Sequence, residues 1–137
     1  RVLIVNTSEQ TGGAAVAANR LMDALNNNGV KAKMLVRDKE TESITVAQIH
    51  EAALEFPVGA LVIFWHMRFS KLHLFDIDIA NSGYDITGLP EFREADIIHL
   101  HWINQGMLSL GSIRKILKSG KPVVWTMHDM WPATSLC

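Results

Sequence analysis

The stretch Val2-Leu3-Ile4-Val5, followed by Gly12-Gly13 and the run AAVAANRLMDAL at 14–25, decides the fold. The first four residues are continuously apolar, as expected of a strand buried on both faces. The polar loop Asn6–Thr11 precedes the glycines, and the run at 14–25 has high helix propensity. Val30–Val36 is expected to form a second strand. This order predicts two parallel strands joined by a right-handed crossover through the helix.

The expected helix carries a narrow apolar face. Ala14, Ala18, Leu21 and Leu25 share that face. Because its first members are small, we expect the helix to lie close to the sheet. Gly29 is a suitable residue to end it.

The rest of the chain continues the alternation of strands and helices. We expect a strand at Ile44–Ile49, a helix at Glu51–Leu74, an irregular stretch at Phe75–Gly88, a strand at Ile97–His101, a helix at Leu108–Lys118 and a strand at Val123–Met127. The pattern predicts an α/β fold with a Rossmann-like three-layer sandwich. Its sheet is mainly parallel, helices cover both faces, and residues 1–137 form one domain.

Composition excludes some classes of partner. The chain has 13 Lys+Arg against 14 Asp+Glu and no long basic run, so nucleic acid is not expected as a partner. The most apolar stretch, Phe56–Trp65, is about half as long as a segment that crosses a bilayer. With Arg68 and Lys71 nearby it is compatible with peripheral membrane contact, but we favour a buried helix. The lone Cys137 and the absence of a signal-peptide pattern favour a cytoplasmic protein.

Two strand ends carry the candidate chemistry. The strand at Ile97–His101 ends in His101-Trp102 with Asn104 close behind, and the strand at Val123–Met127 is followed by His128-Asp129. Carboxyl ends of parallel strands face the ligand crevice. An imidazole can donate to a hydroxyl or phosphate oxygen, an aspartate can bind hydroxyls, and an indole can stack on a sugar or cover the core. We expect Met130-Trp131-Pro132 to form a rigid apolar turn beside them.

The glycine pair Gly12-Gly13 is a candidate anion site, because glycine lets backbone amides approach a ligand and a helix N-terminus favours negative charge. A tight turn is an equally good interpretation. The glycine spacing of the dinucleotide fingerprint is absent, so Asp38 after the second strand is only a weak match to its ribose-binding acid. A nucleotide-triphosphate P-loop is absent too.

Metal binding is not expected. His99 and His101 would leave the same face of their strand, and His128-Asp129 could add ligands. No motif of fixed spacing completes such a set. His99 is more naturally a core or supporting histidine.

Three segments together resemble a known family: Asn6-Thr7-Ser8 with Thr11–Ala15, then Ala95–Trp102, then Trp125–Pro132. They look like the N-terminal, acceptor-side half of a bacterial retaining glycosyltransferase similar to glycosyltransferase family 4. That family has the GT-B architecture of two Rossmann-like domains facing a cleft. The resemblance covers nearly the whole chain.

The resemblance implies a hexosyltransferase-like enzyme of polysaccharide biosynthesis. It would transfer a sugar from a nucleotide-sugar donor to a glycan or lipid-linked acceptor with retention, without a cofactor or metal. Gly12-Gly13 would lie near the donor phosphates and the acceptor, and His128 would contact the transferred sugar, with Asp129 beside it. His101, Trp102 and Asn104 would help to bind substrate.

The chain also departs from that family. The donor-binding C-terminal domain with its paired glutamates is absent from these 137 residues, so we expect this chain alone to be inactive. Ala133–Cys137 stands where relatives tend to have a glycine-rich step before a cysteine. The alternatives are a non-catalytic Rossmann-like module that binds carbohydrate or nucleotide, and a nicotinamide-dependent oxidoreductase, against which the missing glycine spacing argues.

Overall fold

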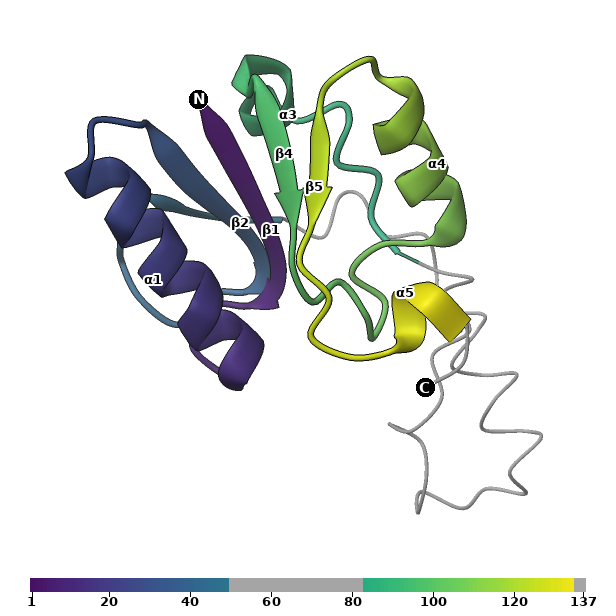
Figure 1. Ribbon diagram of the computed structural model, residues 1–137, viewed down its shortest axis with the longest axis horizontal. Coiled ribbons are helices and arrows are strands. Elements are labelled where there is room, and N and C mark those ends of the chain that lie inside the picture. The colour runs from purple at the N-terminus through teal and green to yellow at the C-terminus, as the bar shows by residue number, and fades with distance from the viewer. Residues whose placement is uncertain (50–82, 135–137) are drawn as a thin grey trace.

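The sheet of this protein is five-stranded and entirely parallel, with the strand order β3-β2-β1-β4-β5 (Figure 1). The computed structural model describes residues 1–49 and 83–134. Its elements are β1 (Val2–Ser8), α1 (Gly13–Asn27), β2 (Ala32–Asp38), β3 (Val46–Gln48), α3 (Pro90–Glu94), β4 (Ile97–Leu100), α4 (Leu110–Lys118), β5 (Val123–Trp125) and α5 (Trp131–Thr134).

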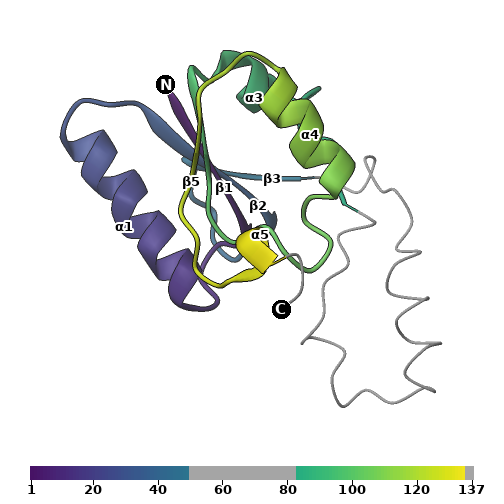
Figure 2. The same cartoon turned by 45° about the vertical axis from the view of Figure 1, so that its right-hand side comes forward.

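Helices cover both faces of the sheet, so the predicted Rossmann-like α/β sandwich is confirmed. Figures 1 and 2 show α1 on one face and α3 with α4 on the other. The start of α1 and the short α5 lie at the edge where the strands end, the lower edge in Figure 1. Among the described residues, none of the helices combines the length and apolarity needed to cross a bilayer.

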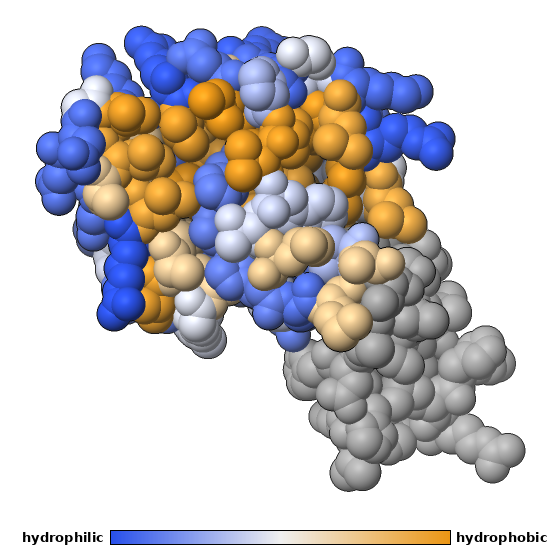
Figure 3. Space-filling view, in the orientation of Figure 1, coloured by the Kyte–Doolittle hydropathy of each residue, from blue (hydrophilic) through white to orange (hydrophobic). Residues whose placement is uncertain are grey.

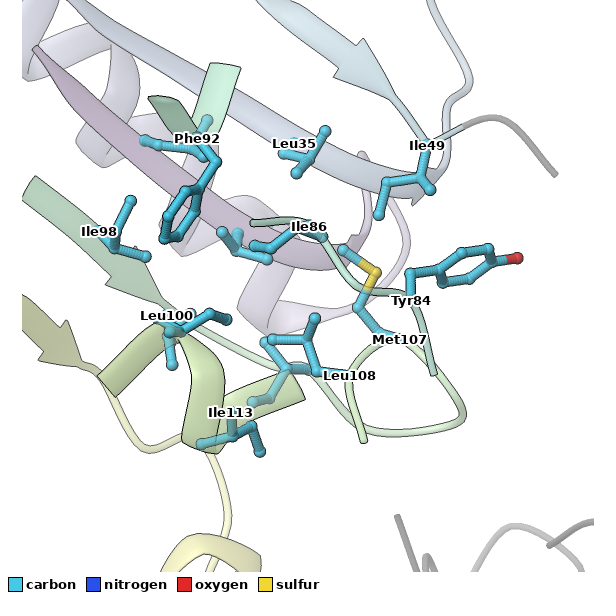
Figure 4. Close-up of a cluster of buried hydrophobic side chains, with 14 of the residues drawn as sticks. Leu35, Ile49, Tyr84, Ile86, Phe92, Ile98, Leu100, Met107, Leu108 and Ile113 are labelled. Atoms are coloured by element: carbon cyan, nitrogen blue, oxygen red, sulfur yellow. The ribbon is translucent and has the colours of Figure 1, made fainter. Parts of the chain in front are cut away.

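The larger core fills the space between the sheet and α3 and α4. Alternate residues of β1 and β4 point into it, including Leu3, Val5, Ile98 and Leu100, all at most 1% exposed. Figure 4 shows Ile98 and Leu100 grouped with Ile113 of α4. Burying side chains of this size typically stabilises a fold by about 1.5–3 kcal/mol each, so this core holds the strand ends in place.

The second core lies under α1. Ala18 and Met22 pack against Ile4 of β1 and Met34 of β2. The predicted small-residue face is confirmed at Ala18, while Ala15 and Met22 are the other buried residues of the helix.

Beyond α1, the same face of the sheet is exposed over β4 and β5. Ile97 and Val124 are 37% and 49% exposed. The space-filling view shows hydrophobic side chains in a band that extends from α1 across this face (Figure 3).

Gly83 is a buried glycine whose backbone packs against the residues that precede α4. A Cβ on Gly83 would lie 2.3 Å from the Ser109 amide nitrogen and 2.5 Å from the Leu108 carbonyl carbon. The neighbouring Tyr84 amide donates to the Met107 carbonyl. Only glycine permits this approach, and the backbone bond then fixes the loop that leads from β4 to α4.

Several predicted boundaries are wrong in detail. β1 continues through Asn6–Ser8, predicted as loop, because β2 pairs with it as far as Ser8 opposite Asp38. The strand predicted at Ile44–Ile49 shortens to Val46–Gln48, and Ile44 is 94% exposed. The strand predicted from Val30 begins at Ala32, because the Val30 amide instead donates to the Leu25 carbonyl at the end of α1.

Two short helices differ from the expectations. Met130-Trp131-Pro132 is not simply a turn, because α5 begins at Trp131 and the Ala133 amide donates to the Met130 carbonyl. α3 was not predicted, although Pro90 at its first turn is a common helix start. The predicted helix at Glu51–Leu74, the stretch Phe56–Trp65 and Cys137 lie outside the described residues.

Candidate functional site

The carboxyl ends of β1 and β4 are joined by backbone and side-chain hydrogen bonds. The Thr7 amide donates to the Trp102 carbonyl at 2.8 Å, and the Trp102 amide donates to the Asn6 side-chain oxygen at 2.9 Å. The chain leaves β1 toward β2 and β3 and returns to β4 on the other side, so this junction is the point where the strand order reverses. Ligands of open α/β sheets bind at such a point.

Three imidazoles meet beside this junction. The ring centroids of His99 and His101 are 4.6 Å apart, and those of His101 and His128 are 5.1 Å apart. His101 Nδ1 and His128 Nε2 share a hydrogen bond of 2.9 Å, and His99 Nε2 pairs with the Thr126 hydroxyl at 2.8 Å. The two predicted strand ends therefore come into direct contact.

His101 is the buried member of this group. It is 3% exposed, and its Nε2 atom has no hydrogen-bond partner among residues 1–49 and 83–134. Burial lowers the pKa of His101 to about 4, with His99 and His128 adding to the effect. Burial also lowers the pKa of His99. Both imidazoles are consequently neutral near pH 7.

Asp129 supports the site from behind. Its Oδ2 accepts hydrogen bonds from Trp102 Nε1 at 2.8 Å and from Asn104 Nδ2 at 3.2 Å. The carboxylate thus fixes the indole and the turn that follows β4. In that turn Gln105 has φ 59° and Gly106 has φ 78°.

Gly12 immediately precedes α1 and has a backbone conformation that only glycine adopts freely, with φ 90° and ψ 166°. No side chain caps the helix, and its first turn holds no acidic residue. The first amides of α1 therefore keep the partial positive charge that attracts anions.

These elements surround one cavity of about 590 Å³, within the size range of small-molecule sites. Its lining comes from the end of β1, the start of α1 and the loops after β2, β4 and β5: Thr7, Ser8, Thr11, Gly12, Gly13, Ala14, Asp38, Glu40, Trp102, Gln105 and His128. Uncapped helix amides, an indole and an imidazole thus face one space. Such a set can hold a phosphate and orient a sugar.

One wall of the cavity is acidic and well ordered by hydrogen bonds. Glu40 accepts from the hydroxyls of Ser8 and Thr11 at 3.2 and 2.9 Å. The buried Glu9 accepts from the Glu40 amide at 2.6 Å and from the amide and hydroxyl of Thr41. Burial acts to raise the pKa of Glu9, yet these hydrogen bonds hold it below its usual value.

Arg37 spans the end of β1. It forms an ion pair with Asp38 at 2.6 Å, and its Nη1 also donates to the Gln105 carbonyl. Asp38 and Gln105 both line the cavity. The guanidinium therefore links the end of β2 to the turn after β4, on opposite sides of β1.

The residues predicted from sequence divide into two sets. Gly12, Gly13, Trp102 and His128 line the cavity, whereas the predicted His101, Asn104 and Asp129 contact those residues from behind.

Sequence reasoning missed part of the wall. It did not single out Glu40, whose pairing with Thr11 depends on a loop contact between residues 29 positions apart. Within residues 1–49 and 83–134, no three or more His, Cys, Asp and Glu side chains are grouped so that they could hold a metal ion.

Comparisons of the chain with protein-family models, with curated proteins and with solved structures find no match.

Proposed function

We propose that this chain is the acceptor-side domain of a retaining GT-B glycosyltransferase that uses a nucleotide-sugar donor. The observation that carries the proposal is the shared cavity of Gly12, Gly13 and His128 at the point where the strand order reverses. The same three residues have the ligand-contacting roles in the family that the sequence resembles. A second domain of the complete protein would supply the donor-nucleotide contacts.

In this proposal one side of the cavity binds the phosphate and the other side binds the sugar. The uncapped start of α1 would stabilise phosphate charge, which grows on the leaving group as the glycosidic bond breaks. His128 would donate a hydrogen bond to a sugar hydroxyl, and Trp102 would stack against a sugar ring. In this mechanism the leaving phosphate helps to deprotonate the acceptor, so His128 orients substrate and need not act as a base.

The test is transfer by the complete protein. Nucleoside diphosphate release would be measured with a panel of UDP- and GDP-hexoses, in the presence of extracted membrane lipids or oligosaccharides as acceptors. We expect His128→Ala to lower turnover at least 100-fold without unfolding the protein, while Lys118→Ala on the exposed face of α4 leaves turnover unchanged. Near-normal turnover of His128→Ala, or no donor turned over by the wild type, would contradict the proposal.

A second candidate is a non-catalytic module that binds a nucleotide. Asp38 favours it, because this carboxylate stands at the end of β2 and shares the cavity with Gly12 and Gly13, the relation that a ribose-binding acid has to a phosphate-binding turn. In that case UDP or ADP would bind to the chain itself, and Asp38→Asn would weaken binding about tenfold without any transfer activity in the complete protein.

A further inference from the structure

We propose that His101 is a positioning residue that fixes the proton of His128 on Nδ1, so that His128 presents a hydrogen-bond donor to the cavity. The two rings are joined by the 2.9 Å hydrogen bond between His101 Nδ1 and His128 Nε2. A neutral imidazole carries one proton on one of two nitrogens. The direction of this single bond therefore decides the tautomer of both rings.

The burial of His101 sets that direction. Its Nε2 is enclosed and finds no hydrogen-bond partner in the part of the chain that the structure describes. With the proton on Nε2, His101 would hold a buried N–H without an acceptor, a rare arrangement in folded proteins. With the proton on Nδ1, the N–H is satisfied by His128 and only a lone pair remains unpaired.

A doubly protonated His101 is disfavoured for a separate reason. The ring is enclosed between His99 and His128, so a second proton would place a positive charge in a buried position beside two other imidazoles. The buried ring therefore stays neutral and keeps one proton to place.

The consequence for His128 follows directly. Its Nε2 accepts from His101, so its own proton lies on Nδ1. This tautomer offers an N–H to an oxygen of a hydroxyl or phosphate and cannot accept a proton at Nε2 without breaking the bond to His101. If the proposed function holds, His128 therefore binds the oxygen of a sugar or phosphate as a donor.

Nitrogen-15 NMR of the histidine rings tests this assignment without any substrate. Two-bond proton–nitrogen correlations distinguish the two tautomers, and the His128→Gln spectrum identifies the His128 signals. At pH 7.5 we expect both His101 and His128 in the Nδ1–H form. A His128 in the Nε2–H form overturns the proposal, whatever the enzyme activity.

Variants of His101 test whether it imposes the tautomer. We expect His101→Leu to move the major His128 population to the Nε2–H form that free histidine prefers. In His101→Asn the side-chain amide can donate in place of the His101 Nδ1–H, so we expect His128 to return to its Nδ1–H form. His99→Gln is the matched control, because it changes the neighbouring ring but not the partner of His128. An unchanged His128 tautomer in folded His101→Leu would overturn the positioning role.

Activity then separates this inference from the proposed function. In the complete protein we expect His101→Leu to lower kcat about tenfold with little change in KM, and His101→Asn to recover most of it. Absence of transfer in the wild type would refute the proposed function and leave the tautomer assignment standing.

Discussion

The indole Nε1 of Trp102 donates a hydrogen bond to Asp129 Oδ2 at 2.8 Å, and this bond joins the residues that follow β4 and β5. The same carboxylate oxygen accepts from Asn104. Asp129, which the sequence marks as a candidate for binding hydroxyls, therefore holds a cavity-lining side chain in place.

Replacing Asp129 should loosen that support. Asp129→Ala leaves the Trp102 and Asn104 donors without this acceptor, so we expect a loss of about 1–3 kcal/mol in the free energy of unfolding. Asp129→Asn keeps an acceptor oxygen and should lose less. Urea denaturation followed by tryptophan fluorescence measures both, and equal losses for the two variants would argue against the hydrogen bonds as the cause.

The two neighbouring glycines of the first loop should respond differently to substitution. Gly12→Ala forces a side chain into the φ 90°, ψ 166° conformation, which costs about 1–3 kcal/mol. Gly13 has no such φ, and a Cβ there meets no atom within 4 Å. We expect Gly13→Ala to be close to neutral in thermal denaturation, and a similar loss in both variants would contradict the conformational explanation.

Gly83→Ala should be among the most destabilising glycine substitutions in the described part of the chain. The new Cβ would lie 2.3 Å from the Ser109 nitrogen, so the backbone must move apart and the Tyr84–Met107 bond with it. We expect a loss of about 2–4 kcal/mol, in the range of severe overpacking. Gly111→Ala in α4, where a Cβ meets its nearest atom at 3.6 Å, is the control and should be neutral or stabilising by calorimetry.

Stability should fall as the solution becomes more acidic. The pKa of His101 is about 4 in the folded protein and near 6.5 when unfolded, so between these values the unfolded chain binds more protons. The free energy of unfolding therefore declines as pH falls from about 6.5 to about 4, by up to roughly 3 kcal/mol from this residue. Denaturation of wild type and His101→Leu at several pH values checks this, because the variant should show a shallower decline over that range.

The fold was predictable because its strands and helices have clear local sequence patterns. Val2–Val5 is a continuous apolar run, and the residues around Ala18 have both helix propensity and an apolar face. The continuation of β1 through Asn6 was not predictable from local pattern. Asn6 is polar yet 1% exposed, and its side-chain oxygen accepts from Trp102, a partner 96 residues away.

The location of the site was predictable from the sequence, but the arrangement of its side chains was not. Parallel strands end at one edge of a sheet, so the sequence indicates that the neighbourhoods of His101 and His128 meet. It does not reveal that His101 lies behind His128, because that division depends on which rotamers the surrounding core allows. The contribution of Glu40 depends on a loop conformation held by the buried Glu9, which no motif signals.

Arg37 connects the end of β2 to the turn after β4, beside the cavity. Its guanidinium pairs with Asp38, the next residue of the same strand, and donates to the Gln105 carbonyl in the turn after β4. This contact restrains the turn after β4 relative to the end of β2. Ordering a loop on binding costs free energy, so a turn that Arg37 already holds lowers that cost for a ligand in the cavity.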